Sequence, residues 1–246
     1  MTSPAAPRSP LVLAVAGLAL LVMGAAAGWL LESARTKLDP ADFGARVHAY
    51  IVDHPEVLVE AADNLKTHGA KKQLAEIADQ LERPFPGAVL GNPQGTVTLV
   101  EFTDFACTYC RGSVADVAAL IAANPDLRVV IRELPIIAPT SPLAARWGLA
   151  AAEQGKYPAF HQAMFAAGRT DQASVEAAAR AAGLDLDRAR KFAADPRALA
   201  EVEANVGFAR KLGISGTPSW VVGEQLITGA VGQESLAKAI AAARAL

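Results

Sequence analysis

Cysteine is scarce in this chain of 246 residues, which has only two, and the charges of the chain nearly cancel. One disulfide cannot stabilise a chain of this length by cross-linking, and a disulfide between positions 107 and 110 would close too small a loop to add much stability. The net charge of −2 at pH 7 offers no broad attraction for nucleic acid or anionic lipid. The 52% apolar content rules out disorder and predicts a globular fold. We therefore expect the cysteines to serve chemistry, and we expect no nucleic-acid partner.

Ligands for a structural zinc ion are also too few. Such sites use four cysteine or histidine ligands at characteristic spacings. The sequence has no second Cys-x-x-Cys and no His-x-x-x-His pair, and its histidines are His48, His54, His68 and His161. We predict no metal site of this type. The two cysteines could still hold Cu(I), which prefers soft thiolate ligands, so a secondary copper role stays open.

One long uncharged run lies near the N-terminus. Residues 11–31, "LVLAVAGLALLVMGAAAGWLL", are long enough as a helix to cross a bilayer core of roughly 30 Å. We interpret residues 1–37 as a membrane-targeting segment, and the length of the run favours an uncleaved anchor. The alternative is a cleaved signal, since Ala25-Ala26-Ala27 would satisfy a small-x-small cleavage site. Either interpretation places the rest of the chain outside the cytoplasm, where cysteine pairs can be oxidised.

Residues 38–83 carry apolar side chains at helical spacing, beginning with Phe43 and Val47. The pattern predicts two or three short helices, with a break at Gly69. Their apolar stripes must be covered, which leaves two interpretations: a helical collar packed on the main domain, or an arm through which the chain forms a homo-oligomer. Proline and glycine are dense in residues 83–95, so we place a boundary or a hairpin turn there.

From residue 96 onwards, strands and helices alternate. The runs "TVTLVEF" and "LRVVIRELPI" are short, apolar and rich in β-branched residues, and they predict two buried strands. A helical stretch lies between them, so the three elements predict a βαβ unit with a parallel pair. Residues 139–212 predict four or five helices; "SWVV" and "QLIT" then predict two strands, and a last helix begins at about residue 233. The fold class is therefore α/β, with a βαβ half, a ββα half and a helical insertion between them.

Both cysteines fall in "FTDFACTYCR", where the first strand ends and a helix begins. Free backbone N–H groups at a helix N-terminus would stabilise a thiolate at Cys107. Cys110 lies one turn further on the same helical face, so it can attack a mixed disulfide at Cys107 without backbone rearrangement. This position favours a redox pair over two inert buried cysteines. Burial of Glu101, inside the preceding strand, would raise the pKa of its carboxyl and suit it to accept the Cys110 proton; a solvent-facing carboxylate is the alternative.

Two stretches together resemble a known family. "VEFTDFACTYCR" and "GISGTPSWVVGEQLITGA" are similar to the DsbA-like thiol-disulfide oxidoreductases of the thioredoxin superfamily. The resemblance covers about residues 85–246, so we place a DsbA-like thioredoxin domain at residues 84–246. Residues 139–212 match the helical insertion of that family. Before this domain, "AYIVDHPEVLVEAADNL" resembles the N-terminal segment of ScsC-like proteins.

The resemblance implies roles for individual residues. Cys107 would be the nucleophile and Cys110 the buried resolving thiol, so their disulfide is the redox-active group and no other cofactor is implied. Thr217-Pro218 matches the loop whose proline is cis and faces the cysteines, with the Thr217 backbone pairing a substrate strand. The position of Glu101 is acidic in the family, which favours its catalytic role.

Thr108 and Tyr109 depart from the family pattern. Strongly oxidising members carry proline and histidine between the cysteines, and a tyrosine cannot place a positive charge beside the thiolate. We therefore expect Thr108 and Tyr109 to tune the pair, giving a disulfide that is less oxidising than in the strongest oxidants.

These observations predict a thiol-disulfide oxidoreductase of the bacterial periplasm, anchored to the inner membrane or released after signal cleavage. It would form disulfides in unfolded or partly folded exported proteins and exchange electrons with a membrane partner of DsbB or DsbD type. One alternative is a disulfide isomerase or reductase kept reduced by a membrane donor. Another is a non-catalytic copper-handling or binding module on the same fold. A glutathione-transferase-like protein is disfavoured because both cysteines are present.

Overall fold

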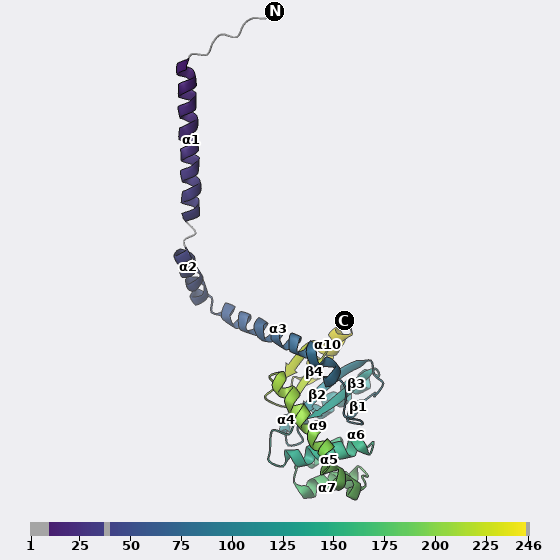
Figure 1. The fold of residues 1–246 in the computed structure, drawn as a ribbon. Helices are drawn as coiled ribbons and strands as arrows, with labels where there is room; N and C mark the ends of the chain where they lie inside the picture. The colour runs from purple at the N-terminus through teal and green to yellow at the C-terminus, as the bar shows by residue number, and fades with distance from the viewer. Residues whose placement is uncertain (1–9, 37–39, 245–246) are drawn as a thin grey trace, which may run out of the picture. The chain divides into compact units, whose positions relative to one another are not determined.

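The first part of the chain is helical where it is described. The computed structural model describes residues 10–36 and 40–244, and the chain divides into two compact units between residues 65 and 66. The first unit holds α1 (Pro10–Thr36), α2 (Pro40–Asp53) and the beginning of α3 (Glu56–Leu81) (Figure 1). Residues 1–9 and 37–39, which belong to the predicted N-terminal segments, lie outside the described residues.

Helix α1 extends over the uncharged run of residues 11–31. Among residues 10–36 and 40–244, none of the helices combines the length and the apolar character that crossing a membrane requires. The predicted N-terminal anchor is therefore not supported by the structure.

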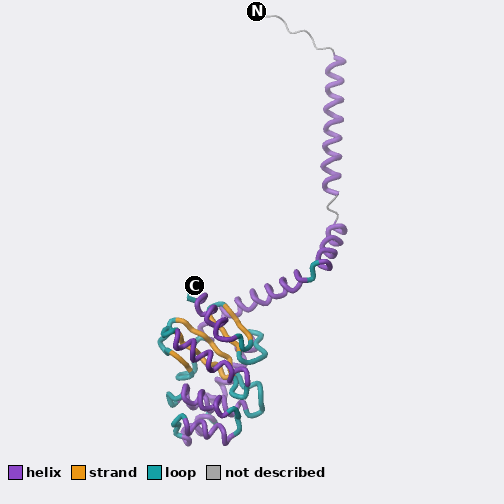
Figure 2. Tube along the Cα trace, turned by 180° about the vertical axis from the view of Figure 1, so that it is seen from behind, coloured by secondary structure: helices purple, strands orange, loops and turns teal. Residues whose placement is uncertain are grey.

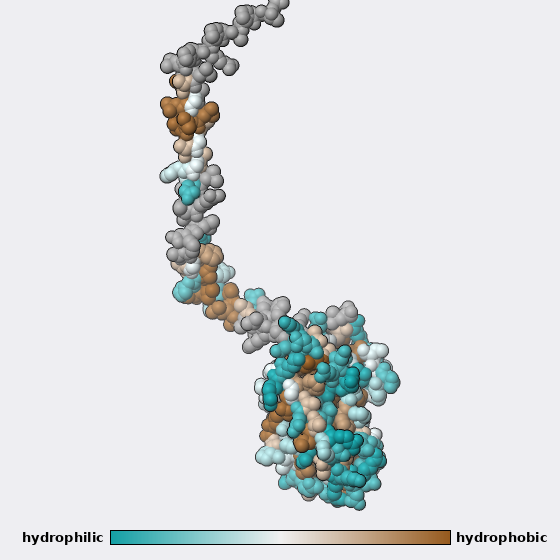
Figure 3. Space-filling view, in the orientation of Figure 1, coloured by the Kyte–Doolittle hydropathy of each residue, from teal (hydrophilic) through white to brown (hydrophobic). Residues whose placement is uncertain are grey.

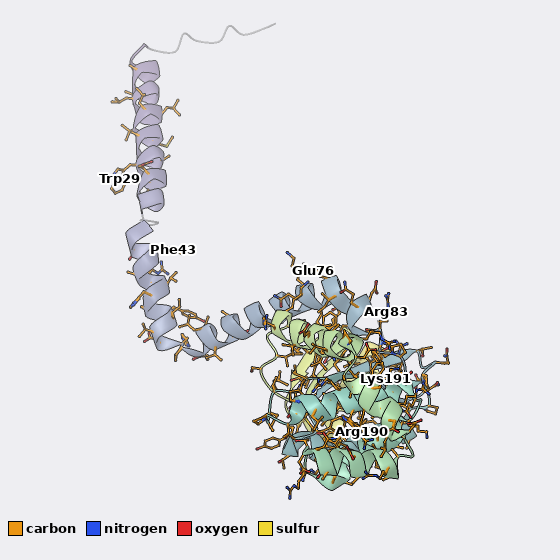
Figure 4. All side chains as sticks on the ribbon, turned by 60° about the horizontal axis from the view of Figure 1, so that its bottom comes forward. Trp29, Phe43, Glu76, Arg83, Arg190 and Lys191 are labelled. Atoms are coloured by element: carbon orange, nitrogen blue, oxygen red, sulfur yellow. The ribbon has the colours of Figure 1, made fainter. Side chains whose placement is uncertain are left out.

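Apolar side chains on α2 and at the start of α3 are exposed. Phe43 is 63% exposed, Tyr50 57% and Leu58 56%. Figure 3 shows hydrophobic side chains over α2, and Figure 4 labels Phe43 there. Helices α2 and α3 confirm the helical character predicted for this segment between residues 40 and 81, although α3, with 26 residues, is longer than the short helices expected.

The second unit is built around a five-stranded sheet in the order β1-β3-β2-β4-β5. Its described strands are β1 (Val89–Gly91), β2 (Val97–Thr103), β3 (Leu127–Glu133), β4 (Ser219–Val222) and β5 (Gln225–Thr228). β2 and β3 pair in parallel, as the βαβ unit predicted, while β1, β4 and β5 each pair antiparallel to a neighbour. The sequence did not predict β1, because three residues beside a glycine-rich turn are too few to show a period.

Different helices cover the two faces of the sheet (Figure 2). The helices that follow β2 are α4 (Thr108–Ala123), α5 (Ser141–Glu153), α6 (Tyr157–Ala167), α7 (Gln172–Ala181), α8 (Leu186–Ala193), α9 (Pro196–Lys211) and α10 (Gly232–Ala243). Leu99 packs with α4 and α10, whereas Val100 and Phe102 pack on the opposite face with α9 and the end of α3. Because side chains alternate along a strand, Glu101 and Thr103 share the α4 face with Leu99.

Helices α5 to α9 form the insertion that the sequence predicted. They enclose a core of their own, to which Trp147, Phe160 and Phe105 belong together with both cysteines. In Figure 1, α5, α6 and α7 gather beyond one end of the sheet. The cysteines therefore lie where the insertion meets the sheet.

Arg132 of β3 holds the end of α3 in the second unit. Its guanidinium, in a side chain that is 3% exposed, donates to three carbonyl oxygens at and just beyond the end of that helix, at 2.6–3.1 Å. It also donates to the carboxylate of Glu201 at 2.8 Å and to the amide oxygen of Asn205 at 3.2 Å. The predicted break at Gly69 is wrong, because α3 runs through it. A glycine costs a helix interior only about 1 kcal/mol, which these bonds and the burial of Leu81 outweigh.

Candidate active site

Asp104 shapes the corner between β2 and α4. The residue is 1% exposed. Its carboxylate accepts hydrogen bonds from the backbone N–H groups of Ala106 at 2.9 Å, Ile136 at 2.9 Å and Ile137 at 2.8 Å. Its carbonyl oxygen accepts a bond from the N–H of Cys107 at 2.9 Å. These bonds satisfy the buried carboxylate and fix the turn that presents Cys107.

Cys107 is the N-cap residue of α4, with extended backbone at φ −80° and ψ 119°. Its Sγ accepts a hydrogen bond from the N–H of Cys110 at 3.3 Å and donates to the carbonyl oxygen of Thr217 at 3.2 Å. Both cysteines are free thiols, and Cys107 is 3% exposed. The first N–H groups of a helix have no partner within it and carry partial positive charge. The Cys107 sulfur therefore lies beside the free N–H groups at the N-terminus of α4.

Cys110 lies one turn into α4 and is 1% exposed. Burial raises the pKa of its thiol well above the ordinary value. The Thr217 hydroxyl, the backbone of Asp104 and the Thr103 hydroxyl lower it in part. Cys107 acts in the same direction as burial. A thiol with a high pKa attacks a disulfide slowly unless a base takes its proton, so a proton acceptor is needed nearby.

Glu101 lies in the middle of β2 and is 2% exposed. In the sheet register it stands between Ile131 of β3 and Trp220 of β4. Burial raises the pKa of its carboxyl to about 7, and the Thr103 hydroxyl acts in the opposite direction. Its Oε2 has no hydrogen-bond partner among the described residues. The solvent-facing alternative is therefore wrong, and the carboxyl can both accept and return a proton near neutral pH.

The Thr217–Pro218 peptide bond is cis, as the resemblance implied. β4 begins at the next residue, Ser219, which pairs with Phe102 of β2. The hydrogen bond between Cys107 Sγ and the Thr217 carbonyl places this loop against the sulfur. The structure thus brings together Cys107, Cys110, Glu101 and the Thr217–Pro218 loop. Cys107 and Thr217, which share a hydrogen bond, are 110 positions apart in the chain, so only folding brings them together.

Thr108 and Tyr109 occupy the first turn of α4, between the cysteines. Both are exposed, Tyr109 at 71%. The two residues that replace the proline and histidine of strong oxidants therefore contact solvent, while the cysteines on either side of them are buried.

Three further buried polar residues lie near Glu101, and the sequence analysis missed them: Thr103, Glu133 and Tyr157. Glu133, at the end of β3, is 1% exposed and accepts a hydrogen bond from the Tyr157 hydroxyl at 2.6 Å. Thr103 is paired with Glu133 in the parallel register. A signal was available for Glu133, because it follows Ile131 by two residues in an apolar strand and alternation places both on one face.

Burial raises the pKa of Glu133 well above its ordinary value. The negative charges of Asp104 and Glu101 act in the same direction, and the hydrogen bond from Tyr157 acts against them. Burial thus favours the protonated form of Glu133, and the carboxyl on this face whose pKa is raised to about 7 is that of Glu101.

His161 is 4% exposed and packs against the rings of Phe105 and Phe165. Burial lowers its pKa to about 4, so it is neutral at pH 7 and provides no positive charge to the cysteines. Among the residues that the structure describes, no group of three or more His, Cys, Asp or Glu side chains is placed to hold a metal ion.

The fold and the site define a class of protein. A Cys-x-x-Cys pair at a helix N-terminus, with a cis-proline loop against its first sulfur, is the arrangement of a thioredoxin-fold thiol-disulfide oxidoreductase. A family model described as a DSBA-like thioredoxin domain matches residues 98–241, which is more than half of the chain. The chain belongs to this DsbA-like family and is a thiol-disulfide oxidoreductase. The family uses a redox-active disulfide and no external cofactor.

A second family model, described as the copper resistance protein ScsC N-terminal domain, matches residues 39–70. Solved structures of thioredoxin-like and ScsC proteins are similar to this chain. A thioredoxin-like oxidoreductase from Silicibacter pomeroyi is 42% identical with a TM-score of 0.65, covering 68% of this chain and 98% of its own. A linker-deletion mutant of ScsC from Proteus mirabilis is 28% identical with a TM-score of 0.70, covering 83% and 94%. A periplasmic thioredoxin-like protein from Salmonella enterica serovar Typhimurium is 26% identical with a TM-score of 0.63, covering 69% and 97%.

Curated relatives are longer proteins. The Na(+)/H(+) antiporter NhaA 3 of Salinispora tropica is 29% identical over 230 residues, which are 91% of this chain and 35% of that protein. The chain thus spans about a third of the length of this relative.

Proposed function

We propose that this protein works in the bacterial periplasm, where it exchanges the Cys107–Cys110 disulfide with unfolded or partly folded exported proteins. Disulfide formation in these clients is its net direction. The observation that carries the proposal is the placement of Cys107 Sγ, between the N–H of Cys110 at 3.3 Å and the Thr217 carbonyl at 3.2 Å. A sulfur held at a helix N-terminus and beside a backbone edge can react with an extended peptide that lies along that edge.

Electrons and protons balance in the proposed cycle. A client thiolate attacks Cys107 Sγ of the oxidised pair, the bond to Cys110 breaks, and Cys110 leaves with the electron pair. The Glu101 carboxylic acid gives that sulfur a proton. A second client thiolate then attacks the client sulfur of the mixed disulfide, and Cys107 leaves as a thiolate. The client has lost two electrons, and the cysteine pair has gained them.

Thr217 and Pro218 position the client in this scheme. The backbone of Thr217 pairs with an extended client strand, and the cis loop holds that strand beside Cys107. Because backbone groups make these contacts, the site accepts clients with little sequence preference.

The direction of exchange depends on the partner that restores the pair. A membrane partner of DsbB type would oxidise it, and one of DsbD type would keep it reduced for isomerase or reductase work. The exposed Tyr109, in place of a histidine, favours the second candidate function, because no positive charge from this position stabilises the Cys107 thiolate.

The segment of residues 38–83 is proposed to join copies of the chain. Its apolar side chains at Phe43, Tyr50 and Leu58 are exposed, and the ScsC N-terminal model matches much of it. Exposed apolar groups of this size are usually covered by a partner. Sedimentation of the exported chain, with and without Phe43→Ser, measures this: the variant should form smaller assemblies, and equal sizes would contradict the proposal.

The periplasmic location draws on the uncharged run at residues 11–31 and on the Salmonella relative, which is described as periplasmic. Fractionation of cells that express the chain, with mass spectrometry of the mature N-terminus, tests the location. Recovery in the cytoplasm would contradict it.

Trapping in intact cells tests the exchange reaction. Cys110→Ser should accumulate mixed disulfides between Cys107 and client proteins, whereas Cys107→Ser should accumulate none. Rapid alkylation reports the redox state of the unmodified pair. A mostly reduced pair would favour the isomerase or reductase function, and equal client oxidation by Cys107→Ser would favour a non-catalytic binding module.

A further inference from the structure

Three buried polar atoms near Cys110 have no hydrogen-bond partner among the described residues. They are Glu101 Oε2, Thr103 Oγ1 and Thr217 Oγ1. Buried polar atoms are nearly always paired, and leaving one unpaired costs roughly 1–3 kcal/mol. Because these atoms are unpaired, they are available to take part in proton transfer to and from the Cys110 thiol.

Thr103 carries a buried hydroxyl on the same strand as Glu101, the proposed base. It is the last residue of β2, is 0% exposed, and lies on the same face of the strand as Glu101, two residues away. Its hydroxyl lowers the pKa of the Glu101 carboxyl and also that of the Cys110 thiol, so it lies close to both, although Thr103 Oγ1 has no hydrogen-bond partner among the described residues of the dithiol form. The Thr217 hydroxyl also lowers the pKa of Cys110, but Thr217 precedes β4 and does not lie on the strand that carries Glu101.

We propose that Thr103 is a relay residue whose hydroxyl carries the proton between Cys110 and Glu101. The proposal rests on the roles proposed above for Cys110 and Glu101. When Cys110 attacks a mixed disulfide at Cys107, its S–H proton passes to Thr103 Oγ1 while the hydroxyl proton of Thr103 passes to Glu101 Oε2. The Cys107–Cys110 bond forms, the bond from Cys107 to the client sulfur breaks, and the client leaves as a thiolate. In the opposite direction, Glu101 returns the proton along the same path.

Other titratable groups face this path from neighbouring elements. Asp104 at the β2–α4 corner is held by three backbone N–H groups. Glu133 of β3, whose pKa is raised by burial, accepts a hydrogen bond from Tyr157 of α6, and burial lowers the pKa of His161 of α6 to about 4. Cys107, the N-cap residue of α4, is bonded to the client sulfur in the mixed disulfide and has no thiol proton there. None of these groups changes in the variants below, so a difference between variants reports on Thr103.

Substitution of Thr103 separates the relay from simple packing. Thr103→Val keeps the volume and removes the hydroxyl, and Thr103→Ser keeps the hydroxyl. Thr98→Val is the matched control, because Thr98 is also buried in β2 but its hydroxyl accepts a bond from Arg128. Removing an unpaired buried hydroxyl leaves no partner unsatisfied, so Thr103→Val should fold, which urea unfolding verifies.

The measurement is the rate at which Cys110 resolves a mixed disulfide between Cys107 and glutathione. Reduced protein is mixed with excess glutathione disulfide between pH 5 and pH 9, quenched with acid, and analysed by mass spectrometry. The unmodified protein should show an inflection near pH 7. Thr103→Val should resolve on the order of tenfold more slowly at pH 7 and lose the inflection, while Thr103→Ser and Thr98→Val should keep both rate and inflection.

Glu101→Gln distinguishes the failure of the relay from the failure of the proposed function. If Glu101→Gln slows resolution and Thr103→Val does not, the relay is overturned and the role of Glu101 stands. If Glu101→Gln has no effect, the proposed role of Glu101 is overturned as well. The double variant should be no slower than Glu101→Gln alone, because both changes interrupt one path; effects that multiply would overturn the relay.

Discussion

The buried carboxyl of Glu101 makes the stability of this protein depend on pH in a way that one substitution should remove. Glu101→Gln keeps the size of the side chain and eliminates its ionisation. We expect the free energy of unfolding of the unmodified protein to fall between pH 5 and pH 8 relative to that of the variant. The same ionisation is what suits Glu101 to accept a proton, so the experiment also tests the chemistry of the site.

The sign and the size follow from the pKa. Burial raises the pKa of Glu101 from 4.5 to about 7, so the folded state binds its proton more tightly than the unfolded state does. The stability that this provides is fully present below pH 4.5 and is lost as the pH rises through 7. At 1.36 kcal/mol for each pKa unit, the complete loss is roughly 3 kcal/mol. Between pH 5 and pH 8 the loss is about 2.5 kcal/mol, because the titration is nearly complete within that interval.

Urea unfolding of both proteins, with reduced cysteines, measures the difference at pH 5, 6, 7 and 8. His161 is shifted by burial alone, so its contribution cancels to first order. The charge of Glu101 also raises the pKa of Glu133, so the variant removes that effect together with the ionisation of Glu101. Glu153→Gln is a suitable control, because the Glu153 side chain is 30% exposed and pairs with Arg188 away from the cysteines. Parallel stability curves for the unmodified protein and Glu101→Gln would refute the reasoning, since they would mean that Glu101 titrates alike in the folded and unfolded states.

Other substitutions give further expected outcomes. Gly148→Ala should destabilise the folded protein by about 1–3 kcal/mol, because the added Cβ would lie 2.8 Å from Glu133 Oε1. Gly207→Ala, with open space around it, should stabilise the folded protein by up to about 1 kcal/mol. Urea unfolding measures both changes. His161→Leu should make stability less sensitive to acid. Burial lowers the pKa of His161 from 6.5 to about 4, so the free energy of unfolding of the unmodified protein falls by roughly 3 kcal/mol as the pH falls through this interval. An equal fall in the variant would contradict the burial of His161 as the cause. Tyr109→His should make the disulfide more oxidising, as measured by equilibration with glutathione, and an unchanged equilibrium would show that this position does not tune the pair.

Local patterns were sufficient to predict the framework of the site. The apolar run before Cys107 and the helical spacing after it define the strand-to-helix corner, and both elements lie where the sequence placed them. Such a corner depends on neighbours in the chain, so periodicity reveals it. The Thr217–Pro218 bond was different, because the isomer of an X-Pro bond is set by tertiary contacts and only the resemblance implied it.

The buried polar residues could not be predicted in the same way. Glu101 is buried because β3 and β4 flank β2 and because α4 covers that face, and β4 lies more than a hundred residues further along the chain. Tyr157 reaches Glu133 only after the helical insertion has packed against the sheet. A period-2 pattern shows which residues share a face, but it does not show which face a distant helix will cover. Thr103, with an ordinary side chain at a strand end, carries no signal of its own.

Rate and direction of exchange have separate origins in this site. A proton path between Cys110 and Glu101 lowers the barrier for attack by Cys110 and for its departure equally, so it cannot decide whether clients are oxidised or reduced. Direction depends on the stability of the dithiol relative to the disulfide, and a thiolate at Cys107 exists only in the dithiol form. Cys107 caps the N-terminus of α4, and the exposed Tyr109 places no basic side chain beside it. The cysteine pair therefore has a smaller preference for the dithiol form than in strong oxidants. The redox partner that restores the pair then has the larger effect on the direction of exchange.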